Sequence, residues 1–127
     1  MGCAIRDSFL TITKRHMPLK VLKLQDRMLK KSAQSLYINA HLIYNNKRLK
    51  FAEPKIAKDP HWAYMYAIDV IKGPWPEAEP SIMKHPYMAY MYARAILKKR
   101  WPEAEPYIKN GDIRSWVDYK KHFNIKD

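Results

Sequence analysis

The chain has few glycines, a single cysteine and no long apolar run, and each shortage excludes a class of protein. Three glycines among 127 residues do not supply the glycine-rich loops that cradle phosphates. Cys3 alone can form neither an internal disulfide nor a zinc site, which favours a reducing compartment. The apolar runs fall short of the roughly 18–20 residues that cross a bilayer, so we expect no transmembrane helix. We also expect no secretory signal and a cytoplasmic location.

Positive charge is abundant and unevenly distributed. There are 24 lysines and arginines against 12 acidic residues, which gives a formal net charge of +12. Residues 1–50 alone carry +9 of this charge. Hydrophobic residues make up 47% of the chain, enough for a packed core in one small domain. Such a charge asymmetry predicts that the N-terminal part faces an acidic partner.

A 26-residue repeat organises the middle of the chain. Residues 59–84 and 85–110 are identical at 14 of 26 aligned positions, including the run WPEAEP. Residues 33–58 are a degenerate third copy that keeps a Glu-Pro pair with an isoleucine two residues later. A repeat of this length indicates stacked supersecondary units. We therefore expect one domain, with a basic region at 1–32, repeats at 33–58, 59–84 and 85–110, and a C-terminal cap at 111–127.

Each clear repeat begins with the signals of a long helix. Asp59 can cap the helix, and Pro60 suits its first position because proline lacks an N–H there. The helix is expected to run to Lys72, where Gly73-Pro74 stops it. The second copy begins at His85-Pro86, and its end is expected at Trp101-Pro102.

The second half of the repeat is rich in proline. Pro76 and Pro80 are too close for one regular helix, since each would remove a backbone hydrogen bond. The pattern predicts a turn over 76–79 and a short helix from Pro80 that carries Ile82 inward. No pattern typical of a strand or hairpin competes.

Neighbouring copies are expected to pack against one another, because the long helix is apolar on most sides. Alanines at equivalent positions would allow close approach, while tyrosines and tryptophans would fill the core. Residues 112–123 read as a closing helix with Asp112 as its cap. The expected packing residues are Ala63, Ala67, Ala89, Ala93, Tyr64, Tyr66, Tyr90, Tyr92, Trp75 and Trp101.

The pattern Pro-x-x-Ala-Tyr-x-Tyr-Ala followed by Trp-Pro-Glu-Ala-Glu-Pro-x-Ile resembles repeats in uncharacterised proteins of tailed bacteriophages and large DNA viruses. The alternation of long and short helices is also similar to leucine-rich-repeat-variant and HEAT-like proteins. The resemblance implies an all-α fold, a short right-handed α-solenoid of about three helix-turn-short-helix repeats, and a viral origin. It implies no catalytic residues.

A basic amphipathic helix is expected to precede the repeats, from Pro18 to about Lys31. On a helical wheel its five bases occupy one arc of about 100°, opposite Val21, Met28 and other apolar residues. Such a face suits phosphates, because each base can neutralise one. The candidate binding residues are Lys14, Arg15, Lys20, Lys23, Arg27, Lys30 and Lys31.

Four interpretations of this face stay open. Nucleic acid, with RNA favoured over DNA, is the first, and an acidic host protein is the second. A solvated face over a core helix and a membrane surface are the others. The membrane is disfavoured because the apolar side of the helix lacks Trp and Phe.

A second basic and aromatic cluster is expected in the last full repeat. Tyr87 and Tyr107 replace polar residues of the preceding copy, so both should be exposed. The sequence leaves open whether this cluster joins the basic helix in space. Its residues are Tyr87, Arg94, Lys98, Lys99, Arg100 and Tyr107.

No motif indicates catalysis. The five histidines lack metal-ligand spacing, and the paired glutamates 77/79 and 103/105 recur as structural residues would. We expect no metal, cofactor or small-molecule substrate. The sequence thus predicts a non-enzymatic, phage-type accessory protein, monomeric or weakly self-associating, that binds RNA or DNA. The alternative is an inhibitor that docks its basic face on an acidic groove of a host nuclease, toxin or polymerase.

Overall fold

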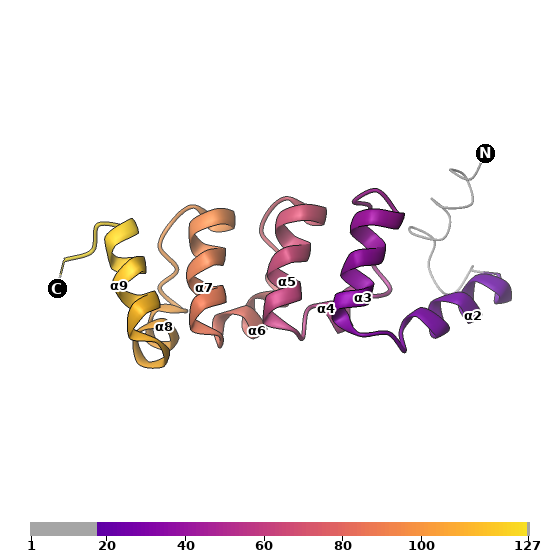
Figure 1. Cartoon of the computed structure of the whole chain (residues 1–127), viewed down its shortest axis with the longest axis horizontal. Helices are drawn as coiled ribbons and strands as arrows, with labels where there is room; N and C mark the ends of the chain where they lie inside the picture. The colour runs from indigo at the N-terminus through magenta and orange to yellow at the C-terminus, as the bar shows by residue number, and fades with distance from the viewer. Residues whose placement is uncertain (1–17, 127) are drawn as a thin grey trace.

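The computed structural model describes residues 18–126, and within that range every regular element is a helix (Figure 1). No described residue lies in a β-strand. The all-α class expected from the sequence is therefore confirmed.

Long helical elements stand side by side in one row, which α2 (Leu19–Met28) does not join (Figure 1). Three of them begin as an α-helix and continue without a break into a wider π-helical turn. The fourth, at the C-terminal end, is a plain α-helix. The bounds are α3 (Ala33–Ile38) with η2 (Asn39–Ile43), α5 (Pro60–Tyr66) with η3 (Ala67–Ile71), α7 (Pro86–Tyr92) with η5 (Ala93–Leu97), and α9 (Ile113–His122).

Short helices connect the members of this row along one edge. They are α4 (Glu53–Ile56), α6 (Glu79–Met83) and α8 (Glu105–Gly111), and the 3₁₀ turn η4 (Pro76–Ala78) precedes α6. The predicted turn and short helix around Pro80 are therefore confirmed. The basic helix α2 (Leu19–Met28) lies at the α3 end of the row (Figure 1).

Four N-caps set the spacing of the row. Ser32, Asp59, His85 and Asp112 each accept a hydrogen bond from a backbone N–H in the first turn of the following helix. The roles predicted for the last three are confirmed. The caps follow one another at 27, 26 and 27 residues. In the first repeat the helix cap therefore lies one residue earlier than a strict 26-residue spacing would place it. The Glu53-Pro54 pair of the same repeat keeps the strict spacing.

The long helices end in a left-handed residue that is not glycine. Lys72 has φ 62° and ψ 39°, and Lys98 has φ 56° and ψ 32°. The helix after His85 therefore stops at Leu97, and the predicted end at Trp101 is wrong. The prediction relied on a glycine or proline to end the helix, and none follows Lys98 directly. The left-handed backbone of Lys98 ends the helix by itself. This conformation costs a lysine roughly 1–2 kcal/mol relative to glycine.

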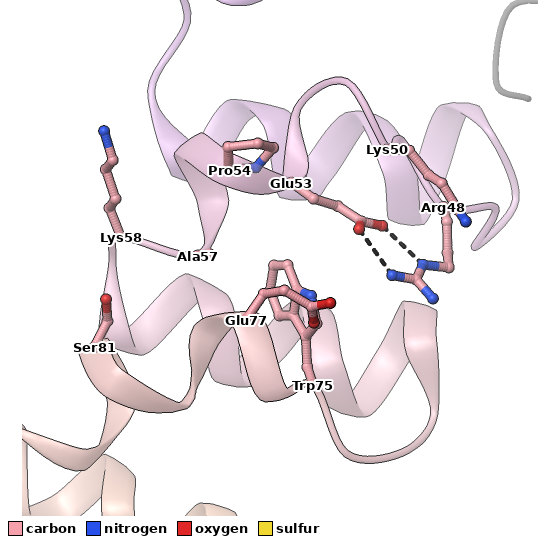
Figure 2. Close-up of a pocket in the computed structure, with 9 residues that line it drawn as sticks. All are labelled: Arg48, Lys50, Glu53, Pro54, Ala57, Lys58, Trp75, Glu77 and Ser81. Carbon is pink, nitrogen blue, oxygen red and sulfur yellow. Dashed lines mark hydrogen bonds and ion pairs between the residues drawn. The ribbon is translucent and has the colours of Figure 1, made fainter. Parts of the chain in front are cut away.

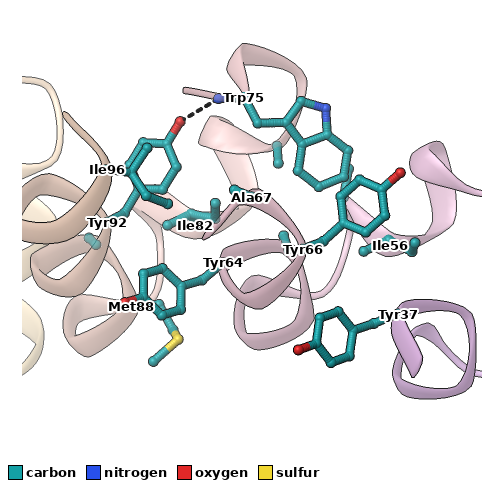
Figure 3. Close-up of a cluster of buried hydrophobic side chains, with 14 of the residues drawn as sticks. Tyr37, Ile56, Tyr64, Tyr66, Ala67, Trp75, Ile82, Met88, Tyr92 and Ile96 are labelled. Atoms are coloured by element: carbon teal, nitrogen blue, oxygen red, sulfur yellow. Dashed lines mark hydrogen bonds between the residues drawn. The ribbon is translucent and has the colours of Figure 1, made fainter. Parts of the chain in front are cut away.

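The core repeats along the row. Ile56, Ile82 and Ile108 are fully buried, as the pattern after each Glu-Pro pair predicts. Tyr66 packs at a tilt on Trp75 with ring centroids 5.0 Å apart (Figure 3). Tyr92 meets Trp101 at the same separation. The alanines and aromatic residues expected to pack between helices are all buried.

A recurring hydrogen-bond motif, here named the clasp, ties three of the long helices, α5, α7 and α9, to the loop that precedes each of them. In a clasp, a buried tyrosine hydroxyl donates to a glutamate at the start of a short helix and accepts a backbone N–H four residues before that glutamate. The hydroxyl-to-carboxylate distances are 2.7, 2.8 and 2.8 Å, and all three N–H contacts are 2.8 Å. The clasps are Tyr66–Glu53–Leu49, Tyr92–Glu79–Trp75 and Tyr119–Glu105–Trp101.

An arginine reinforces the outer two clasps. Arg48 donates two hydrogen bonds of 2.8 Å to Glu53, and Arg100 donates bonds of 3.0 and 2.8 Å to Glu105. The Arg100 hydrogen bonds hold the pKa of Glu105 below its usual value. Pro74 occupies the equivalent position of the middle repeat, so the Glu79 clasp lacks this arginine.

Gly111 is the position where α8 meets α7, and we expect Gly111→Ala to destabilise the protein. A Cβ there would lie 2.2 Å from Cγ of Pro86, whose ring cannot rotate away. The cost of the clash, about 1–3 kcal/mol, exceeds the helical gain of alanine over glycine. Gly73→Ala is the matched control, because its Cβ would meet no atom within 4 Å. Urea unfolding of both variants tests this, and equal midpoints would contradict it.

Candidate nucleic-acid interface

The basic helix ends earlier than the predicted Lys31, so three of the five predicted bases, Lys20, Lys23 and Arg27, lie on it. Helix α2 runs from Leu19 to Met28, and Lys30 and Lys31 continue the chain beyond it. All five bases of the arc are exposed. They are Lys20, Lys23, Arg27, Lys30 and Lys31.

The opposite side of α2 faces the protein. Gln25 and Met28 are buried, and Val21, Leu22 and Leu29 are partly covered. The Lys55 ammonium of α4 donates to the carbonyl oxygen of Leu29 at 2.6 Å. The arc is therefore carried on an anchored helix.

An acidic residue lies beside the bases, and two of the predicted bases fall outside the described part of the chain. Asp26 is exposed and, at about 100° per residue, lies next to the arc, so the face is not purely cationic. Lys14 and Arg15, two of the predicted binding residues, lie outside the described residues.

The second predicted cluster does not form one surface. Tyr87 sits in the first turn of α7, whereas Lys98, Lys99 and Arg100 follow the end of η5. The 12 helical residues between these ends span about 18 Å. Tyr87 and Tyr107 are 49% and 44% exposed, as expected. The grouping is wrong because closeness in a repeat alignment does not place residues at the same end of a helix.

Arg94 belongs to neither end of the helix. It lies in η5, one turn after Tyr90, and donates to the Tyr90 hydroxyl at 3.3 Å. Arg100 is held by Glu105 in its clasp. Because Arg100 is paired with Glu105, the positive charge at this end of the helix comes from Lys98 and Lys99, which are both exposed.

A groove of about 600 Å³ lies between α4 and the η4–α6 segment (Figure 2). Arg48 and Lys50 line one end, and Lys58 and Ser81 line the other. Glu53 and Glu77 lie between them, and Trp75 forms part of the wall. Its charges are mixed, and Glu53 is already bound to Arg48 and Tyr66. The groove can therefore offer cations to an anionic group only at its two ends.

Among residues 18–126, no group of three or more histidine, cysteine, aspartate or glutamate side chains is placed to hold a metal ion. In the same part of the chain, no helix combines the length and the apolar character needed to cross a bilayer.

Sequence reasoning missed the clasps, although a signal for them exists. A tyrosine follows the helix cap by seven residues in three cases: Tyr66 after Asp59, Tyr92 after His85 and Tyr119 after Asp112. Each of these tyrosines bonds to the glutamate of the recurring Glu-Pro pair. If the repeats are aligned by their helix caps and not by a fixed 26-residue spacing, α9 and its Tyr119 fall in line with α5 and α7.

Comparison with known proteins gives no relative. No protein-family model matches the chain, and neither a curated protein nor a solved structure matches it.

Proposed function

We propose that this chain is a non-enzymatic nucleic-acid-binding protein that contacts RNA, in preference to DNA, through the basic arc of α2. The row of helices acts as its scaffold, a short right-handed α-solenoid with α9 as its terminal cap. In the setting that the repeats resemble, it would be a bacteriophage accessory protein in the host cytoplasm.

The observation that carries the proposal is the exposure of Lys20, Lys23 and Arg27 on one side of an anchored helix, with Lys30 and Lys31 exposed just beyond its end. A lysine or arginine that neutralises a phosphate releases a counterion from the nucleic acid. Binding of this kind is therefore driven by counterion release and weakens as the salt concentration rises. An anchored helix presents its charges without first having to order itself, which lowers the entropic cost of binding.

We expect each of Lys20→Ala, Lys23→Ala, Arg27→Ala and Lys30→Ala to weaken RNA binding and flatten its salt dependence. The plot of log affinity against log salt should lose about 0.7 of slope per substitution for a single strand, and about 0.9 for a DNA duplex. Fluorescence anisotropy with a labelled 30-nucleotide oligouridine, the matching DNA strand and a DNA duplex measures this.

Two control variants sharpen the experiment. Lys109→Ala removes an exposed base from α8, away from the arc, and should leave the affinity unchanged. Asp26→Asn removes the acidic group beside the arc and should raise it. If the wild-type protein binds none of the three probes at low salt, the proposal is wrong.

A second function is supported by a different observation. Leu19 and Leu24 on α2 are 66% and 39% exposed, so apolar groups accompany the bases. Protein interfaces combine apolar contacts with charge, whereas phosphate contacts need only the charge. This favours an acidic host protein as the alternative partner, with the chain acting as its inhibitor.

The double variant Leu19→Ser/Leu24→Ser separates the two functions. It should leave RNA affinity unchanged if the partner is nucleic acid, because no base is removed. Pull-down from nuclease-treated lysate with wild-type and variant protein supplies the second measurement. A stoichiometric acidic partner that only the wild type retains would support the inhibitor.

A further inference from the structure

The loops at the C-terminal ends of the long helices form a second cationic surface, here named the loop edge. It consists of residues 44–50, 72–75, 98–101 and 121–126, which lie along the upper side of the row in Figure 1. These four segments contain nine basic and no acidic residues. The bases are Lys47, Arg48, Lys50, Lys72, Lys98, Lys99, Arg100, Lys121 and Lys126.

The opposite edge of the row has a smaller excess. Its connecting segments, 56–60, 82–86 and 108–112, contain three lysines and two aspartates, and the segment before α3 adds Lys30 and Lys31. The near-neutral charge of the repeats therefore conceals a separation of charge between the two edges. Arg48 and Arg100 are paired with glutamates, so the lysines carry the excess.

Two of these lysines occupy positions that favour other residues. The left-handed conformation is found at Asn46 and Asn124 in the first and last segments, and asparagine tolerates it well. Lys72 and Lys98 adopt it in the middle two segments, where lysine is strained. A strained residue retained where a relaxed one would fit suggests that its side chain has a use.

Lys72 and Lys98 also face the same hollow. A depression of about 200 Å³ between the ends of η3 and η5 is lined by both lysines and by Gly73. Adjacent packed helices are about 8–10 Å apart. The hollow therefore places two cations where one backbone can contact both.

We infer that the loop edge is a second contact surface for the phosphate backbone of a nucleic acid, used together with α2. The inference rests on the proposed function. Four helix ends at about 10 Å intervals cover about 30 Å, the length of roughly nine nucleotides at 3.4 Å each. Of the large, exposed apolar side chains of the described residues, Leu42 and Ile43 border the first segment, and none lies in or beside the other three. A protein partner would lack an apolar anchor at those three segments, whereas a phosphate backbone needs none.

Lys72→Asn/Lys98→Asn in the full-length chain tests the inference. Asparagine keeps the backbone conformation seen at Asn46 and removes the charge. We expect an unchanged or higher melting temperature, an affinity for 30-nucleotide oligouridine about tenfold lower at low salt, and a salt slope smaller by about 1.4. A role limited to the fold would instead alter the melting temperature and leave RNA affinity unchanged.

Two matched variants complete the experiment. Lys84→Asn/Lys109→Asn removes two exposed lysines from the opposite edge and should bind as the wild type does. Gly73→Lys adds a base where the neighbouring repeats have Lys47 and Lys99, and its Cβ has open space. It should raise the affinity and the salt slope.

The outcomes separate this inference from the proposed function. If the α2 variants lose affinity while the loop-edge variants do not, the inference is overturned and the function stands. If only the loop-edge variants lose affinity, the loop edge is the contact surface in place of α2, and both the joint use of the two surfaces and the proposed role of α2 are wrong. Equal losses in the two double lysine variants would mean a general charge effect and would overturn the inference, as would a wild-type protein that binds no probe.

Discussion

Replacing Tyr66 by phenylalanine is expected to lower the free energy of unfolding by about 2–4 kcal/mol. The hydroxyl is fully buried, donates to Glu53 at 2.7 Å and accepts the N–H of Leu49 at 2.8 Å. Phenylalanine fills the same space, so the variant leaves a buried N–H without its acceptor and a carboxylate without one donor. The loss reflects these unsatisfied groups, since the ring contact with Trp75 is retained.

Urea unfolding followed by circular dichroism measures this loss. Tyr87→Phe is the control, because its ring is 49% exposed and its change should stay within about 0.5 kcal/mol. Glu53→Gln is the companion variant, because it keeps an acceptor for Tyr66 and removes the charge that Arg48 binds. If Tyr66→Phe is as stable as the wild type, the clasp does not stabilise the fold.

The second large effect is expected at alkaline pH. Burial raises the pKa of Tyr37 to about 12, and its hydrogen bond to Asp69 adds to the shift. Burial likewise raises the pKa of Tyr119 to about 12, with a further contribution from Glu105. The pKa values of Tyr66 and Tyr92 are raised as well, chiefly by burial.

The direction of the pH effect follows from the unfolded state. An unfolded tyrosine titrates near pH 10, so above that value the unfolded chain loses protons that the folded chain keeps. Stability is complete below pH 10 and falls above it, by about 1.4 kcal/mol per pH unit for each tyrosine. Because four such groups titrate over the same range, the loss between pH 10 and pH 12 is expected to be a large part of the stability of an ordinary domain.

Chemical denaturation at several pH values between 9 and 12 tests this expectation. Tyr119→Phe provides the control, because it removes one of the titrating groups. Its stability deficit relative to the wild type should shrink as the pH rises above 10. A constant deficit, or a wild-type protein that keeps its full stability at pH 12, would contradict the assignment of the tyrosines.

The sequence predicts the local structure of this protein well, because its signals are local. Asp59 and His85 are caps since they precede a proline at the first helical position, and that rule involves only neighbouring residues. The burial of Ile82 follows from its place after a Glu-Pro pair. Lys20, Lys23 and Arg27 are exposed on α2 because their spacing fits one side of a helix, whereas Lys30 and Lys31 lie past its end at Met28.

Other features depend on residues that are distant in the sequence. The hydroxyl of Tyr119 bonds to Glu105, which belongs to the preceding repeat, and one inserted residue conceals the relation. Lys98 ends its helix through a left-handed backbone that the amino acid itself disfavours. The grouping of Lys98 with Tyr107 fails for a related reason, since helix length separates them in space.

The clasps also bear on how the chain reaches its fold. Their backbone donors and tyrosine hydroxyls are only 17, 17 and 18 residues apart in the sequence. Contacts that close such short loops give a low relative contact order, and proteins with low contact order fold fast. Any one clasp can serve as a nucleus on which the neighbouring helices assemble. Because each tyrosine lies after its glutamate, a chain emerging from the ribosome completes its clasps one after another from the N-terminal end.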